Sequence, residues 1–343
     1  MLRVMFVTAA VLLCCAVGAR ADEVSVRVEK RTYPVVANRG DRPQWVVPPA
    51  RRLAGLKEYE TTAVVLENGR LRVTVLPQLG GRVVSAFDKK ANREVFWQND
   101  QINDNVSWSM GGARFSFPFH EHGRHFDETS GWTVVRGEDG SASVAIDMRF
   151  EPFVKASETR RYGRATCLRL TQLVRLAPDD DRFTLIGRVD NPMPIQSGFK
   201  LWALLRFDNV EGTHILLPEA ATVPHGGATL DPWPVWGGRD HSRTGDWQDS
   251  RFVVGLKNDI RGWYDPAADA NHLVWTDPSK APGAKIVVYR AGAKNGYYET
   301  WVGNHEVFEE TGRILPPYSR YELLVKVGLV AGEGRVRLPE PGP

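Results

Sequence analysis

Residues 67–88 read Glu67-Asn-Gly-Arg-Leu-Arg-Val-Thr-Val-Leu-Pro-Gln-Leu-Gly-Gly-Arg-Val-Val-Ser-Ala-Phe-Asp88. Apolar and polar residues alternate in both halves of this stretch, and a Gly-Gly pair stands between the halves. Alternation with a period of two is typical of a strand with one buried face, and a glycine-rich break between two such runs is typical of a turn. The stretch therefore predicts an antiparallel hairpin.

The same pattern recurs along most of the chain. Alternating runs occupy residues 143–150, 183–190 and 321–327, and clusters of Gly, Pro, Asn and Asp separate such runs. No stretch of useful length shows the 3.6-residue period of an amphipathic helix. Many short strands joined by Gly- and Pro-rich turns predict an all-β protein with large antiparallel sheets in one domain.

The two ends of the chain differ from this central part. Residues 1–21 combine an early Arg, an apolar run and Ala19-Arg20-Ala21, which together predict a cleaved signal peptide and a periplasmic or secreted protein. Residues 22–58 are rich in Pro and Arg and are expected to be extended over the main domain, which we place at 59–335. Residues 336–343 are expected to form a loose tail.

Composition restricts the classes of partner. The chain has 44 basic and 41 acidic residues, without a basic block, which argues against nucleic acid as a partner. After the leader, no run is long and apolar enough for a membrane helix. The 11 Trp are more informative, because indole rings stack on sugar rings, although most Trp are expected in the core. Oligomeric state stays open.

Several motifs together resemble the galactose-mutarotase-like superfamily. The stretch 67–85 is similar to its opening E-N-x-x-L-x-V-x-V-x-P-x-x-G-G-x-x-x-S, and the closest resemblance is to DUF5107-type domains. Similar motifs follow in the same order at 89–97, 111–118, 233–242 and 298–322. The resemblance covers about residues 59–335 and implies an antiparallel β-supersandwich of the galactose mutarotase type.

The resemblance also implies a site. Aldose 1-epimerases of this fold use a late Glu as base and a His as acid, and the matching positions here are Glu299 and His122. His120 and His125 are alternatives to His122 for the same role. A carboxylate suits a base where its surroundings favour proton transfer near neutral pH. The alternative for Glu299 is a surface residue of an alternating strand, with Tyr298 and Thr300 on the other face.

The stretch Met110–His125 carries unusual chemistry for a loop. His120, His122 and His125 lie within six residues of one another, and Arg114 and Arg124 lie among or just before them. We expect these side chains to contact substrate. Because imidazole also binds metals, a divalent metal at this loop is a weaker alternative; otherwise we expect no cofactor. Exposed loop histidines are the alternative for at least one of the three.

One position departs from the family pattern. Mutarotases usually carry a second His on a mid-chain strand, where this sequence has Trp202 within 198–207 and no His. An indole could stack on a sugar but is a poor proton donor to a ring oxygen. A second aromatic cluster contains Trp233, Trp236 and Asp240, and it is expected either to line a sugar cleft or to cap the sandwich.

These features together predict an exported carbohydrate-binding protein. If it is an enzyme, the resemblance implies an isomerase of the aldose 1-epimerase kind or another carbohydrate-active enzyme. The alternative is a non-catalytic structural or protein-binding domain of the cell envelope. Fold resemblance alone does not decide among them, because one fold supports many functions.

Overall fold

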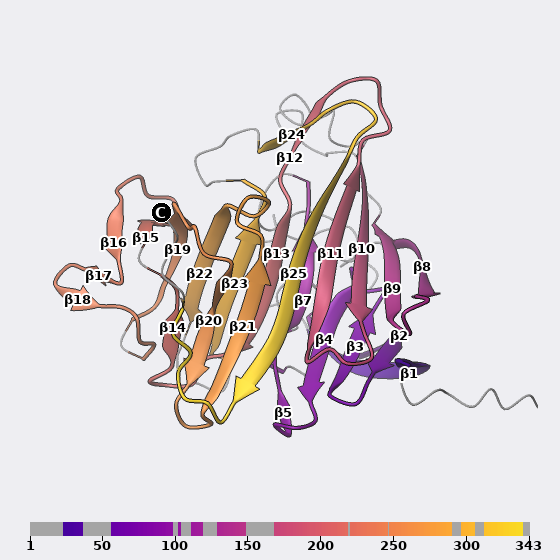
Figure 1. The fold of residues 1–343 in the computed structure, drawn as a ribbon, viewed down its shortest axis with the longest axis horizontal. Helices are drawn as coiled ribbons and strands as arrows, with labels where there is room; N and C mark the ends of the chain where they lie inside the picture. The colour runs from indigo at the N-terminus through magenta and orange to yellow at the C-terminus, as the bar shows by residue number, and fades with distance from the viewer. Residues whose placement is uncertain are drawn as a thin grey trace, which may run out of the picture.

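The computed structural model describes residues 23–36, 56–98, 102–103, 111–118, 129–148, 168–218, 220–245, 247–289, 296–305 and 312–338. Within these residues all regular elements are strands, and they form two large sheets that lie face to face (Figure 1). The predicted all-β antiparallel class is confirmed. No helix in the described part of the chain is long and apolar enough to cross a membrane.

The larger sheet has 13 strands and carries the residues of most interest. Its order is β16 (Asp231–Trp233), β15 (Ala220–Pro224), β19 (Asp249–Val254), β22 (Gly283–Tyr289), β23 (Tyr297–Gly303), β13 (Trp202–Asp208), β7 (Gly112–Ser116), β4 (Arg82–Asp88), β3 (Leu71–Leu76), β2 (Glu58–Glu67), β1 (Ser25–Val36) and β6 (Ile102–Asn103). The two-residue strand β5 (Arg93–Glu94) pairs with β4. Only β1 with β6 is parallel among the described pairs.

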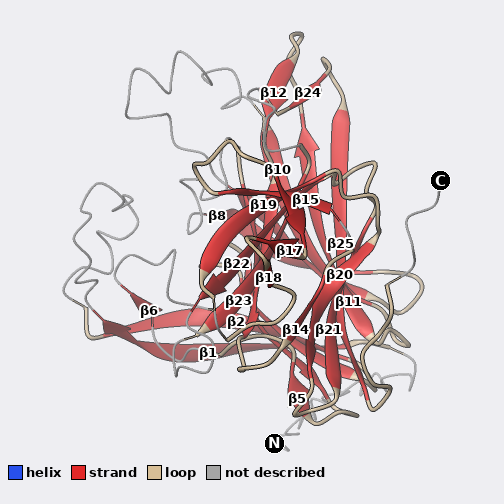
Figure 2. Ribbon diagram, turned by 90° about the vertical axis from the view of Figure 1, so that its left-hand side faces the viewer, coloured by secondary structure: helices blue, strands red, loops and turns tan. Residues whose placement is uncertain are grey.

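The smaller sheet has eight strands. Its order is β14 (His214–Leu216), β20 (Ile260–Asp265), β21 (Ala270–Thr276), β25 (Arg320–Ala331), β11 (Arg182–Asp190), β10 (Arg169–Leu176), β9 (Ala142–Met148) and β8 (Thr129–Arg136). Two short ribbons complete the described strands, β12 (Ser197–Phe199) with β24 (Arg313–Leu315) and β17 (Val235–Trp236) with β18 (Arg239–Asp240). Figure 2 shows β12 and β24 projecting together at one end of the molecule.

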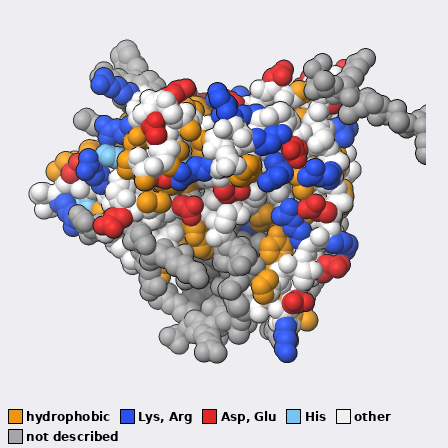
Figure 3. Space-filling view, turned by 90° about the horizontal axis from the view of Figure 1, so that it is seen from below, with side chains coloured by type: hydrophobic (Ala, Val, Ile, Leu, Met, Phe, Trp, Pro, Cys, Tyr) orange, Lys and Arg blue, Asp and Glu red, His pale blue; other side chains and the backbone are white. Residues whose placement is uncertain are grey.

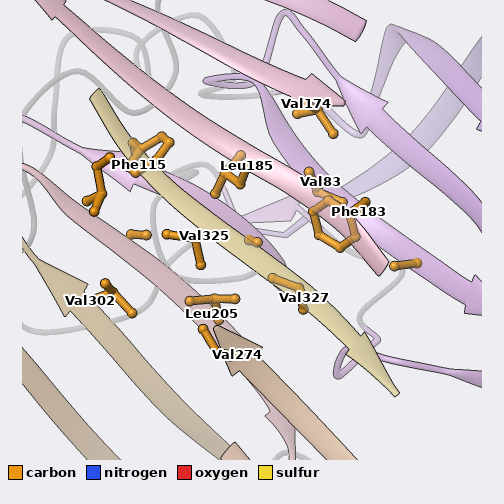
Figure 4. Close-up of a cluster of buried hydrophobic side chains, with 14 of the residues drawn as sticks. Val83, Phe115, Val174, Phe183, Leu185, Leu205, Val274, Val302, Val325 and Val327 are labelled. Carbon is orange, nitrogen blue, oxygen red and sulfur yellow. The ribbon is translucent and has the colours of Figure 1, made fainter. Parts of the chain in front are cut away.

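The core lies between the two sheets because each inward face contributes every second side chain. Phe115 and Leu205 from the larger sheet meet Leu185, Val325 and Val327 from the smaller one (Figure 4). The alternation seen in the sequence is therefore the alternation between this core and the opposite face of each sheet. Burial of this apolar surface is the main stabilising term of the fold.

The hairpin predicted at 67–88 is present as β3 and β4, with β2 beside them. The segment before residue 59 also contributes to the sheet, because β1 pairs with β2 from Ser25 to Pro34. Residues 1–22, which include the predicted signal peptide, and residues 37–55 lie outside the described residues. Export therefore stays a prediction.

Asn68, in the turn between β2 and β3, ties the two sheets together. Its amide nitrogen donates to the carbonyl oxygens of Ala177 and Asp180, in the turn between β10 and β11, at 2.7 and 2.9 Å. Its side-chain oxygen accepts from the backbone N–H groups of Arg70 and Leu71 at 2.8 and 2.6 Å. One buried side chain thus closes its own turn and holds a turn of the opposite sheet.

We expect Asn68→Ala to lower the free energy of unfolding by about 2–4 kcal/mol, because it removes these bonds and leaves buried carbonyl and N–H groups unsatisfied. Urea unfolding measures the change. Asn68→Asp keeps the acceptor of the turn but loses the donors to the other sheet. A variant N68D as stable as the parent would show that the tie between the sheets contributes nothing.

Candidate functional site

Glu299 lies on the face of the larger sheet that is turned away from the smaller sheet, which we call the outer face. Its neighbours in β23, Tyr298 and Val302, belong to the core between the sheets, whereas Glu299 and Trp301 point the other way. Glu299 is only 2% exposed. It is therefore not a surface residue, and the strand alternation places it as expected.

Arg206 on β13 stands directly across from Glu299 on β23. Its Nε and Nη2 atoms donate to Oε1 of Glu299 at 2.8 and 2.5 Å. The indole Nε1 of Trp301 donates to the other carboxylate oxygen, Oε2, at 2.9 Å. Both oxygens of this buried carboxylate therefore accept hydrogen bonds, and its charge is matched by a guanidinium. We call these three residues the Arg206–Glu299–Trp301 cluster.

Aromatic rings surround this cluster. The guanidinium of Arg206 lies over the ring of Tyr297 at 4.3 Å, and burial, then the nearby Glu299 carboxylate, raises the pKa of Tyr297 to about 12. Trp202 and Leu204 pack beside Trp301 as a small apolar group on the outer face. The cluster is thus an ionic centre set in an apolar surface, where hydrogen bonds are stronger than in water.

Trp202 is enclosed rather than presented as a platform. It meets Trp301 edge to face at 6.5 Å and His305 at 4.9 Å between ring centres. A Cβ at Gly303 would lie 2.6 Å from the Trp202 ring, so the ring rests against the backbone of β23. Its predicted contact with a sugar stays a prediction, and such contact requires the ring to be uncovered.

Further basic side chains share the outer face. Arg114 of β7 lies opposite Leu204 of β13 in the strand register, and Arg82 of β4 donates to the carbonyl of Gly111 at 3.1 Å. Lys285 of β22 lies opposite Trp301, with its ammonium 5.4 Å from that ring. Arg114, predicted to bind substrate, is therefore brought to the same face as Glu299 by the order of the strands.

His305 lies two residues after the end of β23 and is buried. Its Nδ1 lies 2.9 Å from Oδ1 of Asn304. Burial, then the positive charge of Lys200, lowers the pKa of His305 to about 3, so its imidazole is neutral at physiological pH. A neutral imidazole beside Trp202 is a hydrogen-bonding group rather than a cation.

The residues that the sequence did not single out are Arg206, Trp301, Lys285 and His305. Alternation offered a signal for two of them, because Arg206 shares the strand face of Trp202, and Trp301 shares that of Glu299. No motif marked Lys285 or His305. Their relation to the cluster arises from pairing between strands far apart in the sequence.

The second aromatic cluster occupies a different place. Trp233 and Trp236 pack against the core between the sheets, with ring centres 5.8 Å apart. Trp236 stacks on His241 at 3.3 Å and has the Arg251 guanidinium 4.4 Å from its ring centre. Arg251 faces the core side of β19, as shown by its register with Ile286, a core residue of β22.

This arrangement corresponds to the capping alternative more closely than to a cleft shared with Glu299. Arg251 and Phe252 are neighbours in β19 and point to opposite faces, and Phe252 is the one beside Trp202. Asp240 is exposed in the β17–β18 ribbon and accepts from the N–H of Ser242 at 2.8 Å. Ligand binding by Trp233, Trp236 and Asp240 stays a prediction.

His120, His122, Arg124 and His125 lie outside the described residues. Their predicted roles, including the acid role of His122 and the alternative of a metal at this loop, therefore stay predictions. Within the described residues, no group of three or more His, Cys, Asp or Glu side chains gathers as a metal-binding set.

Asp208, at the end of β13, has a carboxyl group whose pKa differs from its ordinary value. Burial raises the pKa of its carboxyl to about 6; the positive charge of Arg93 opposes this change, and the carboxylates of Glu94 and Asp265 add to it. Between about pH 4 and pH 6, the Asp208 carboxyl is therefore protonated in the folded state and ionised in the unfolded chain. The free energy of unfolding therefore loses the contribution of Asp208 as pH rises from about 4 to about 7.

We expect Asp208→Asn to remove this part of the pH dependence. The free energy of unfolding of D208N minus that of the parent should rise by about 2 kcal/mol between pH 4 and pH 7.5. This value is smaller than the full pKa difference would give, because the side chain is partly exposed and water screens its charge. Urea unfolding at both values measures the difference, in which contributions of other groups cancel. An unchanged difference at the two pH values would contradict the assignment.

Comparison with known proteins shows which family and which solved structures this chain resembles. Residues 56–322 match the sequence model of a family described as a domain of unknown function, DUF5107. A TPR-domain containing protein from Parabacteroides distasonis is 18% identical with a TM-score of 0.71, over 92% of this chain and 57% of that chain. The present chain thus spans little more than half the length of that protein.

Two further solved structures are matched over nearly the whole of their own length. A putative aldose 1-epimerase from Escherichia coli K12 is 13% identical with a TM-score of 0.56, over 78% of this chain and 98% of that chain. A galactose mutarotase-like protein from Clostridium acetobutylicum is 12% identical with a TM-score of 0.59, over 79% of this chain and 96% of that chain. The fold is therefore galactose mutarotase-like, as the motifs predicted.

Proposed function

We propose that this chain, which belongs to the DUF5107 family, binds a carbohydrate on the outer face of the larger sheet, at the Arg206–Glu299–Trp301 cluster. The observation that carries the proposal is the buried carboxylate, held by a guanidinium and an indole N–H in the middle of a galactose mutarotase-like sheet. We propose also that the protein acts in the periplasm or outside the cell, as the leader sequence predicts.

The chemistry of the cluster suits a polyhydroxylated ligand. Oε1 of Glu299 already accepts two hydrogen bonds from Arg206, whereas Oε2 accepts one from Trp301 and has a second lone pair that can accept from a sugar hydroxyl. Basic side chains on the same face can donate to hydroxyl oxygens. Aromatic rings beside polar groups match the mixed apolar and polar surface of a sugar. Because the three side chains are nearly inaccessible, we expect ligand association to require a local opening of the chain.

Binding is favoured over epimerisation as the first property to test. With donors already directed at both of its oxygens, Glu299 is placed to orient hydroxyl groups as a fixed acceptor. The enzymatic alternative, in which Glu299 takes a proton and His122 gives one, is supported by the fold relationship to a protein described as a putative aldose 1-epimerase. The structural alternative requires no ligand on this face.

The test compares two cross-strand Arg–Glu pairs. Glu299→Gln alters the proposed site, whereas Glu322→Gln alters a pair with Arg188 on the solvent side of the smaller sheet. Thermal shifts with monosaccharides and oligosaccharides, followed by titration calorimetry, should show saturable binding by the parent and by E322Q, and at least tenfold weaker binding by E299Q.

Other results would change the assignment. Anomer exchange, measured by NMR, gives sugar turnover. Turnover by the parent that is absent in E299Q, together with saturable binding by both proteins, would favour the epimerase-like alternative. A sugar-induced rise in the melting temperature that EDTA abolishes would support a metal at His120, His122 and His125. Absence of saturable binding across a broad panel of sugars would reject the proposal and favour a structural domain.

A further inference from the structure

Arg261 on β20 is a cation inside the core between the two sheets. Its side chain is 1% exposed, and the neighbouring Trp263, two residues along the same strand face, is fully buried. One guanidinium nitrogen, Nη2, donates to the hydroxyl of Thr276 at 2.9 Å. The remaining Nε and Nη1 atoms have no protein acceptor among the described residues.

No acidic side chain compensates this charge within the described part of the chain. The one titratable group among these residues that acts on Arg261 is the hydroxyl of Tyr298; burial raises the pKa of this hydroxyl, so it is uncharged at neutral pH and supplies no counter-charge. Burial lowers the pKa of Arg261 to about 10, so the guanidinium is still protonated at neutral pH. A buried, uncompensated charge destabilises a fold by several kcal/mol unless something neutralises it.

Among the described residues around Arg261, buried donors without an acceptor outnumber buried acceptors without a donor. The Nε1–H of Trp263 is a second buried donor that has no acceptor among the residues that the structure describes. Val274, directly across from Arg261 in β21, is a core residue. His272, which stacks on Trp263 at 4.4 Å, adds one acceptor: its Nδ1–H donates to the carbonyl oxygen of Val95 at 2.8 Å, so its Nε2 keeps a lone pair that has no donor among the described residues.

The uncompensated positive charge of Arg261 suits an anion better than water. A buried water needs two to four polar partners and must direct its own hydrogens at acceptors. An anion accepts from every N–H that points at it and neutralises the guanidinium as well. The apolar walls favour a small, weakly hydrated, monovalent species over phosphate or sulfate, whose several charges would be costly to bury.

We propose that the core of this protein holds a halide ion, bound by the Nε and Nη1 atoms of Arg261 between β20 and the larger sheet. The ion acts as a structural counter-charge that stabilises the packing of the two sheets. This site lies on the core side of the larger sheet, whereas the proposed carbohydrate site lies on its outer face, so the two proposals stand or fail separately.

The first experiment measures thermal stability of the full chain in sodium chloride or bromide, against sodium gluconate at equal ionic strength. We expect halide to raise the melting temperature saturably by roughly 2–5 °C. Arg261→Met should lose this dependence. Arg251→Met is the matched control, because Arg251 is also buried but is paired with Asp231 and Asp249; it should keep the dependence.

The second experiment does not depend on a variant. Crystals of the parent protein grown in bromide should show an anomalous peak within hydrogen-bonding distance of the Arg261 guanidinium. A peak there supports the proposal even if R261M does not fold. Bromide crystals without a peak at Arg261, or a folded R261M that keeps the full halide dependence, would overturn it.

Discussion

Arg206→Met is expected to lower the free energy of unfolding by about 3–5 kcal/mol. The change leaves the Glu299 carboxylate buried, with the indole N–H of Trp301 but without its guanidinium. The cost arises mainly from the uncompensated buried charge, not from the lost attraction between the two groups. Chemical denaturation measured by circular dichroism gives the value.

Arg188→Met is the matched control. Arg188 and Glu322 also face each other across two paired strands, but their side chains are 34% and 37% exposed. Because water solvates a carboxylate that loses its partner at the surface, R188M should cost less than about 1 kcal/mol. The two arginines thus differ in burial while sharing the geometry of a cross-strand pair.

A double variant separates charge from packing. R206M/E299Q removes both charges, and the amide oxygen of Gln can still accept from Trp301. It should be more stable than R206M alone, with a coupling energy of about 2 kcal/mol. If the double variant were as unstable as the sum of the single changes, the loss would come from packing of the long side chains and not from the buried charge.

Alternation in the sequence was sufficient to predict most strands and the face that each residue occupies. Residues 71–76 and 183–190 form β3 and β11 almost as expected, because a period of two is a local property of the chain. The same rule placed Tyr298 and Glu299 on opposite faces. The family resemblance, carried by motifs in a fixed order, supplied the class of sandwich, which periodicity alone does not define.

The order of strands was not predictable in this way. β13 lies between β7 and β23, and this order brings Arg206 to Glu299 across 93 positions of the chain. Periodicity carries no information about which distant strands pair. The sequence therefore singled out Glu299 as a candidate but missed its partner, although the alternation that places Arg206 on the same strand face as Trp202 was visible.

Short strands were even harder to predict from the sequence. β16, β17 and β18 have only two or three residues each, which is too few for a pattern to show which side is buried. The sequence left the cluster around Trp236 open between a cleft and a cap for this reason. Surface charge raised no such difficulty, because Lys and Arg lie among Asp and Glu on the described face in Figure 3, in agreement with the absence of a basic block.

Gly112→Ala is expected to destabilise the protein by about 4 kcal/mol or more, an unusually large effect for one methyl group. Gly112 opens β7 with a φ of +85°, a region that Ala adopts only at a cost, and the added Cβ would lie 1.8 Å from the carbonyl oxygen of Val83 on β4. That atom belongs to the backbone of the neighbouring strand, so relief requires β4 and β7 to separate.

The consequence extends to the candidate site, because β7 carries Arg114 and pairs with β13, the strand of Arg206. Gly69→Ala provides the control: no atom lies within 4 Å of its added Cβ, and its φ is outside the left-handed region, so it should change stability by less than about 1 kcal/mol. Urea unfolding of both variants measures the contrast. Equal stability of G112A and G69A would mean that β4 and β7 are not held in this close register, and the proposed placement of Arg114 beside the Arg206–Glu299–Trp301 cluster would then have to be abandoned.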